Sequence, residues 1–158
     1  MPELPGLLPV LGNPPLGFRF GVVFLAGGVS PNSLDILFQK VSGIGSTVET
    51  QPVQEGGQNL YTQALPKKIQ YENLELERGL LIGSPLAHEF DAAMALFKFK
   101  PASVLVSLYD QSRTPLASWL FHQAYPVRWR IGDLDATANS VVIEHLSLTY
   151  QRMQSIRL

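Results

Sequence analysis

The chain has 158 residues, with 12 Lys and Arg against 13 Asp and Glu, and it contains no cysteine. This length fits one domain. The missing cysteines exclude disulfides, thiolate metal ligands and a cysteine nucleophile, and the balanced charge argues against a dedicated, specific nucleic-acid binder. Charged residues make up only 16% of the chain, against about 25% in a typical domain. This shortage favours a chain that buries surface against copies of itself, with an uncharged Gly- and Pro-rich surface as the alternative.

Residues 1–17 are rich in proline and are predicted to form an extended arm. Each proline fixes its φ angle and lacks a backbone donor, which disfavours both a helix and a central strand. The arm also carries several leucines, which suit a segment that packs on a neighbouring surface. Residues 18–158 are expected to form one β domain. No apolar run reaches the about 20 residues of a membrane span, so we expect no membrane anchor.

Apolar or alternating segments separated by turn residues predict strands over most of the remaining chain. The predicted strands are Phe18–Leu25, Leu34–Val41, Thr47–Val53, Ile69–Leu76, Ser103–Tyr109, Pro115–His122 continuing through Ala124–Arg130, and Ser140–Tyr150. Within Ile69–Leu76 the apolar positions change phase, which predicts a bulge or break near Glu72 and Asn73. The polar segment Gln51–Gln63 is predicted to be a long loop or hairpin tip.

One helix is predicted over about residues 84–97. Ser84 followed by Pro85 is typical of a helix start. Five apolar residues then recur at helical spacing and predict a face turned to the core, namely Leu86, Phe90, Ala93, Met94 and Phe97. The whole pattern predicts a mainly β fold, either a β-barrel or paired antiparallel sheets, with one flanking α-helix.

Motifs that carry catalysis or bind ligands are weak in this sequence. No serine lies in a G-x-S-x-G elbow, and the histidines lack the spacing of a metal motif. Gly43-x-Gly45 is followed by a predicted strand rather than a helix, which indicates a bend and not a phosphate loop. We therefore expect no enzyme, metal or cofactor. Two alternatives stay open: a monomeric barrel around an apolar ligand, and an enzyme in which His122, His145 and an aspartate meet.

An ordered series of short motifs gives the sequence a family resemblance. The series is Phe38–Gly43, Val48-Glu49, Glu55–Asn59, Leu65-Pro66, Tyr71–Leu74, Leu76, Arg78-Gly79, Trp119-x-Phe121, Ala124-x-Pro126-Val127-x-Trp129, Asp133-Leu134-x-Ala136, Asn139 and Ile143-Glu144-x-Leu146. No single piece is specific. In this order, over about residues 18–150, the set resembles the T4-like phage tail tube protein family.

The resemblance implies a structural subunit of the inner tube of a contractile phage tail or a related extracellular injection particle. Such subunits form hexameric rings that stack into a hollow conduit, without catalysis or a cofactor. The implied partners are copies of the chain, neighbouring rings, and spike, hub, sheath or baseplate proteins. The particle would assemble in the bacterial cytoplasm and act as a phage tail or after release. Residues 1–17 and Ala26–Asp35 look longer than in the family, which favours a baseplate-proximal tube adaptor over the repeating main tube subunit.

The resemblance also gives candidate interface residues. Gln51–Lys68 is the candidate for ring-to-ring contact, with Glu55, Gly56, Gly57 and Asn59 as the matched residues; a solvated hairpin tip is the alternative. Glu144 is a charge on the apolar face of the predicted last strand. We expect it either to pair with an arginine such as Arg78 or to point into the lumen of the tube.

Overall fold

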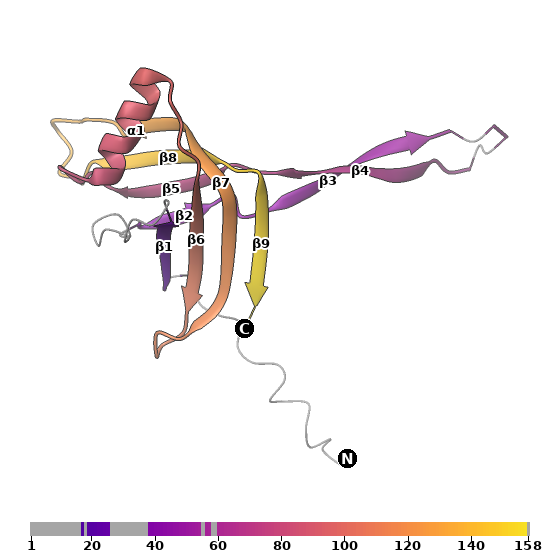
Figure 1. The fold of residues 1–158 in the computed structure, drawn as a ribbon, viewed down its shortest axis with the longest axis horizontal. Coiled ribbons are helices and arrows are strands. Elements are labelled where there is room, and N and C mark those ends of the chain that lie inside the picture. Colours follow the sequence, from indigo (N-terminus) through magenta and orange to yellow (C-terminus); the bar gives the residue numbers. More distant parts are fainter. Residues whose placement is uncertain (1–16, 18, 26–37, 55, 58–59, 158) are drawn as a thin grey trace, which may run out of the picture.

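The computed structural model describes residues 17, 19–25, 38–54, 56–57 and 60–157 (Figure 1). Their strands and helix are β1 (Phe20–Leu25), β2 (Lys40–Ser42), β3 (Ser46–Val53), β4 (Gln63–Tyr71), β5 (Leu74–Gly79), α1 (Pro85–Leu96), β6 (Ala102–Tyr109), β7 (Pro115–Ile131), β8 (Ile143–Thr149) and β9 (Arg152–Arg157). The mainly β fold with one helix is confirmed. The predicted arm 1–17 lies outside the described residues except for Gly17, as does the first half of the predicted strand Leu34–Val41.

The long strand β7 joins two antiparallel sheets. Its first half pairs with β6 on one edge and with β9 on the other, whereas its second half, Tyr125–Ile131, pairs with β8. Between the halves, Gln123 has a φ of 55°, a left-handed conformation that bends the strand. The strand order is β1-β6-β7-β8-β5-β2, with β9 beside β7. The predicted strand Pro115–His122, continuing through Ala124–Arg130, is therefore observed as one bent strand.

Helix α1 begins and ends as the sequence predicts. The Ser84 hydroxyl accepts a hydrogen bond from the Ala87 amide at 3.3 Å, and Phe97 ends the helix in a left-handed conformation. Leu86, Phe90 and Ala93 are buried in the core, where the Phe90 and Phe24 ring centroids lie 6.2 Å apart.

Two residues predicted on the buried face of α1 are instead exposed. Met94 is 37% and Phe97 83% exposed. Phe97 lies beyond the last helical turn and adopts a left-handed φ of 50°, so its side chain leaves the helical stripe. Met94 follows Ala93 directly and is therefore rotated about 100° away from it around the helix axis.

Strand β9 is absent from the sequence prediction. The predicted last strand, Ser140–Tyr150, is observed as Ile143–Thr149, and the chain then turns and continues as β9. The Gln151 amide in this turn donates a hydrogen bond to the His122 carbonyl of β7 at 3.0 Å, which ties the turn to β7. Strand β9 is mostly exposed and rich in long polar side chains, so it lacks the apolar alternation on which strand prediction depends.

A buried ion pair connects the neighbouring strands β5 and β8 to the start of α1. Arg78 Nε donates a hydrogen bond to Glu144 Oε2 at 2.7 Å, and both side chains are fully buried. Arg78 Nη2 also donates to the Ser84 hydroxyl at 2.8 Å, and Trp129 Nε1 donates to Glu144 Oε1 at 2.7 Å. Glu144 therefore pairs with Arg78, which confirms the first of the two alternatives.

Replacing Glu144 by alanine should destabilise the protein strongly. Glu144→Ala leaves the Arg78 guanidinium in the core without its carboxylate, and breaking one side of a buried pair costs about 3–5 kcal/mol of unfolding free energy. The measurement is equilibrium unfolding in urea, followed by tryptophan fluorescence. The control is Lys40→Ala, which removes the exposed Lys40–Glu77 pair and should cost about 1 kcal/mol or less. Equal effects of the two variants would contradict this account.

The Gly43-x-Gly45 bend depends on its first glycine. Gly43 has a φ of +80°, and a Cβ atom built there would lie 2.0 Å from the Asn73 carbonyl oxygen, whereas a Cβ at Gly45 would meet nothing within 4 Å. The bend therefore needs Gly43 for both conformation and space, and it lies between β2 and β3, as the sequence indicates.

Gly43→Ala should destabilise the protein by more than about 1 kcal/mol, because the added methyl group clashes with backbone at an already unfavourable φ. Gly45→Ala is the matched control and should stay within about 0.5 kcal/mol of the parent. Thermal unfolding monitored by circular dichroism compares the two. A melting temperature that falls equally in both variants would refute the assignment of the constraint to Gly43.

Candidate subunit interface

Strands β3 and β4 form a hairpin that projects from the rest of the protein (Figure 1). They pair with each other over their whole length and make a two-stranded sheet of their own, separate from the seven strands of the two sheets that β7 joins. An isolated two-stranded hairpin is marginally stable in water and needs a surface to cover one of its faces. The hairpin is therefore the first candidate for contact with another subunit.

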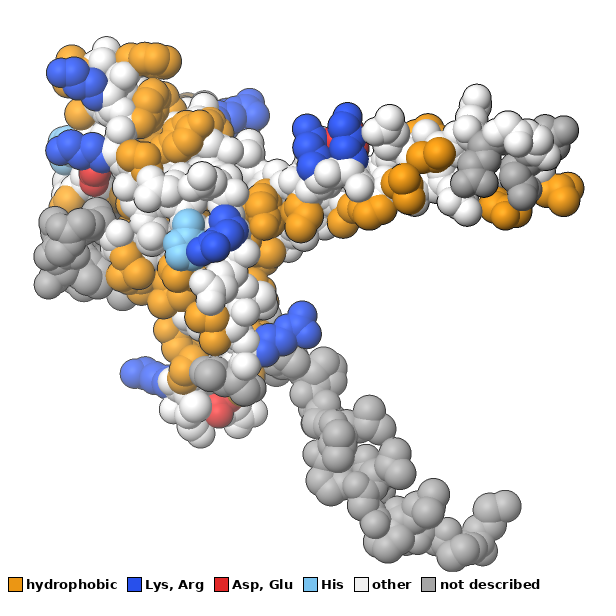
Figure 2. Space-filling view, turned by 45° about the vertical axis from the view of Figure 1, so that its right-hand side comes forward, with side chains coloured by type: hydrophobic (Ala, Val, Ile, Leu, Met, Phe, Trp, Pro, Cys, Tyr) orange, Lys and Arg blue, Asp and Glu red, His pale blue; other side chains and the backbone are white. Residues whose placement is uncertain are grey.

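One face of the hairpin is apolar. Val48 and Ile69 lie directly opposite each other across the two strands, and they are 52% and 58% exposed. Figure 2 shows apolar side chains following one side of the projecting arm and lysines on the other. A cross-strand apolar pair that remains in water contributes less than a buried one, so this face gains most when another surface covers it.

The other face of the hairpin carries charge. Glu49 neighbours Val48 in β3, so its side chain points to the opposite face, where it pairs with Lys67 at 3.6 Å and Lys68 at 3.4 Å. The pairing register shifts between Glu49 and Thr50, and this bulge allows two consecutive lysines to reach one carboxylate. Gln70 also donates to Glu49 at 3.1 Å. This face is already satisfied within the chain.

The predicted site residues belong to the tip of the hairpin. Gly56 and Gly57 lie in its turn and are exposed, whereas Glu55 and Asn59 lie outside the described residues. Gly57 has a φ of +96° with open space around its Cβ position, so it is needed for its conformation and not for close packing. Nearby, Leu60 is 93% exposed. The predicted loop Gln51–Gln63 is shorter than expected, because β3 continues to Val53.

The base of the hairpin is anchored by aromatic packing. The Tyr71 ring lies 5.4 Å from the Tyr150 ring, which in turn lies 4.7 Å from Phe121, measured between centroids. Burial raises the pKa of the Tyr150 hydroxyl. The predicted interruption of the strand at Glu72 and Asn73 is confirmed, since β4 ends at Tyr71 and β5 begins at Leu74. The hairpin thus projects from a cluster of packed aromatic rings.

The residues considered for catalysis are not gathered in one site. His122 lies near Arg152 of β9 at 3.5 Å, whereas His145 lies in the other sheet, 3.6 Å from Glu77. Within residues 19–25, 38–54, 56–57 and 60–157, no three metal-ligating side chains come together. In the same part of the chain, no helix has the length and apolar character to cross a membrane.

The fold is that of proteins from contractile injection systems. The chain is 37% identical to a chain in the cryo-EM structure of the anti-feeding prophage (AFP) baseplate, 6-fold symmetrised, with a TM-score of 0.85 over 92% of this chain and 97% of that one. A chain in the PVC extracellular contractile injection system sheath-tube complex, in its extended state, is 20% identical with a TM-score of 0.78, covering 97% and 99%. A type six secretion system protein shares the fold at 10% identity and a TM-score of 0.56, covering 87% and 83%.

The family follows from the sequence itself. Residues 16–154 match the model of the T4-like virus tail tube protein gp19 family, and the chain belongs to this family. Among curated protein sequences, none matches the chain. The protein is therefore a structural component of the contractile tail and injection system class, as the ordered motifs in its sequence indicate.

Hydrogen exchange should separate the hairpin from the core. Amides of β3 and β4 should exchange much faster than those of β6 and β7 in the unassembled protein, because the hairpin bonds are covered by no third strand or helix. Mass spectrometry of exchange at increasing protein concentration makes the comparison. Hairpin amides that are as protected as the core in the monomer would show that the hairpin is stable without a covering surface.

Proposed function

We propose that the chain forms hexameric rings in the inner tube of a contractile injection particle. The observation that carries this proposal is the β3–β4 hairpin, which extends from the fold and exposes the Val48–Ile69 pair. A ring requires a heterologous interface, in which one patch meets a different patch on the next copy. A projecting arm with one apolar and one satisfied charged face fits this need. The six-fold symmetry of the AFP baseplate structure supports a ring of six.

Within this class, we favour the baseplate-proximal tube adaptor over the repeating main tube subunit. The AFP chain that is 37% identical comes from a baseplate structure, whereas the chain from the sheath-tube complex is 20% identical. The proline-rich residues 1–17 and the expanded connection Ala26–Asp35 offer additional contacts for an adaptor. Its neighbours would then be tube rings on one side and spike, hub or baseplate proteins on the other, with the sheath outside.

The tip residues Glu55, Gly56, Gly57 and Asn59 are our candidates for contact between rings. They end an arm whose strands of 8 and 9 residues reach about 26–30 Å at roughly 3.3 Å per residue. The function requires assembly and no catalysis. Assembly would take place in the bacterial cytoplasm, and the finished particle would act as a phage tail or after release.

A charge on the apolar face of the hairpin should prevent assembly without unfolding the subunit. Val48→Lys places an ammonium group where the proposed interface excludes water, so the apparent association constant should fall at least tenfold. Thr47→Lys is the matched control, because Thr47 neighbours Val48 and points to the charged face. Light scattering after size-exclusion chromatography gives the oligomer mass, and circular dichroism checks the fold.

Negative-stain electron microscopy over a concentration series tests the proposal itself. Rings with an open centre support the conduit, with single rings favouring the adaptor and long tubes the main subunit. Monomers at every concentration would overturn self-assembly and favour the ligand-binding barrel. The hollow of about 390 Å³ beside α1 is partly open to solvent.

A further inference from the structure

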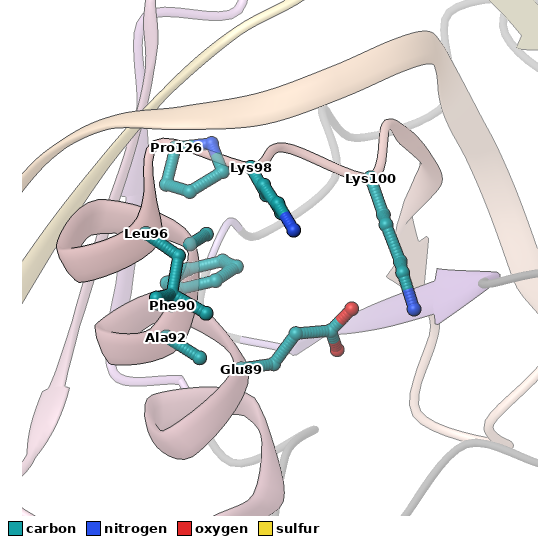
Figure 3. A pocket seen from close by; sticks show the side chains of 8 residues that line it. Glu89, Phe90, Ala92, Leu96, Lys98, Lys100 and Pro126 are labelled. Atoms are coloured by element: carbon teal, nitrogen blue, oxygen red, sulfur yellow. The ribbon is translucent and has the colours of Figure 1, made fainter.

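A groove lies between α1 and the start of the second half of β7 (Figure 3). Its volume is about 390 Å³, and Phe90, Leu96 and Pro126 give it apolar walls. Lys98 and Lys100 project over it from the segment that follows the helix, with Glu89 on the helix side. Among the described residues, neither lysine forms an ion pair. The groove therefore combines an apolar floor with a rim of net positive charge.

Three packed aromatic rings, of which Phe97 and Tyr125 are exposed, continue from the end of the groove. Phe97 packs on Phe99 at 5.4 Å between centroids, and Phe99 packs on Tyr125 at 5.6 Å. Phe97 remains 83% exposed, which is costly for so large an apolar side chain. Aromatic-lined grooves are the surfaces that recognise proline-rich chains, because such chains are already extended and lose little entropy on binding.

The chain itself contains a segment with the matching chemistry. Residues 1–16 read MPELPGLLPVLGNPPL, with five prolines, six Leu or Val side chains, and Glu3 as their one charged side chain. The prolines fit aromatic rings, the leucines fit the apolar floor, and Glu3 complements Lys98 and Lys100. At about 3.1 Å per residue, sixteen residues in an extended polyproline conformation span roughly 50 Å.

The segment joins the fold far from the groove of its own copy. It precedes β1, whose first residue, Phe20, pairs with Leu108 at one end of β6. The groove lies at the other end of β6, where Ala102 pairs with Ala124 of β7. The start of β1, to which the donor segment is attached, and the acceptor groove thus lie at opposite ends of the same sheet. This is the arrangement of a head-to-tail, heterologous contact that links one copy to the next.

We propose that residues 1–16 of a neighbouring copy bind in the groove formed by α1, Lys98, Lys100 and Pro126. The proposal rests on the proposed function in one respect, namely that copies of the chain assemble. It adds a second contact, independent of the β3–β4 hairpin, that closes over the exposed aromatic rings. Such a contact would tie successive subunits together.

The absence of cysteine from the chain allows a direct test. Full-length Leu8→Cys and full-length Ala92→Cys are mixed, assembled and oxidised, and disulfide-linked dimers are quantified on a denaturing gel. Ala92 is exposed and lines the groove. The control is Leu8→Cys mixed with Ala138→Cys, an exposed position in the β7–β8 connection outside the groove. We expect the mixed dimer with Ala92→Cys to exceed the control at least fivefold.

A charge exchange provides the second measurement. Glu3→Lys in the Leu8→Cys chain should lower the cross-linked fraction about two- to fivefold, the size expected for exposed ion pairs. Adding Lys98→Glu and Lys100→Glu to the Ala92→Cys chain should restore it. Microscopy of the same samples separates the two proposals. Rings without the specific mixed dimer overturn the groove contact alone. The absence of any assembly overturns both the groove contact and the proposed function.

Discussion

The arrangement of the fold depends on the buried ion pair between Arg78 and Glu144. Removing two charges from water is costly, and the cost is recovered only when each charge is fully hydrogen-bonded. Here the carboxylate accepts from Arg78 and Trp129, and the guanidinium also reaches Ser84, the residue that caps α1. The pair therefore does more than hold β5 beside β8. It fixes where the helix begins, and with it the groove along the helix.

The molecule consists of a body that buries its own apolar core and a hairpin whose apolar face no other part of the described chain covers. The body encloses an apolar core between its sheets and α1, in which Val22, Leu76, Phe121 and Leu146 are fully buried. The hairpin has complete backbone pairing but leaves its apolar face in water. This contrast is consistent with the low charge of the chain, because surfaces that pack against other copies do not need the charged groups that keep a monomer soluble.

Most of the fold follows from local patterns that the sequence displays clearly. The Ser84-Pro85 start of the helix and the phase change at Glu72 and Asn73 both result from residues whose chemistry permits few arrangements. For Glu144 the sequence allowed two alternatives, and the structure selects the pair with Arg78. The apolar face of the hairpin was less visible, since Val48 and Ile69 lie in segments that also read as ordinary half-buried strands. Their exposure depends on the body ending where the hairpin begins, which is a property of the tertiary structure.

Strand β9 and the exposed Phe97 were missed for related reasons. The strand is polar because it pairs at an edge, and the phenylalanine leaves the helical stripe because it adopts the left-handed conformation that ends the helix. Composition alone predicts a long loop or hairpin tip at Gln51–Gln63, and the resemblance to a family adds the candidate contact residues within it. Local pattern thus predicts elements well, and it predicts poorly which of their faces stay uncovered.

The continuity of β7 has a mechanical consequence. In the proposed function, a tube that is pushed lengthwise must transmit force through each subunit without letting the two sheets of the subunit slide apart. In this fold both sheets share one strand, which runs unbroken from Pro115 to Ile131 and is hydrogen-bonded to a neighbour on both edges of its first half. Relative displacement of the sheets would require many of those bonds to break together, in shear, so the subunit resists deformation along β7 as a single stiff body.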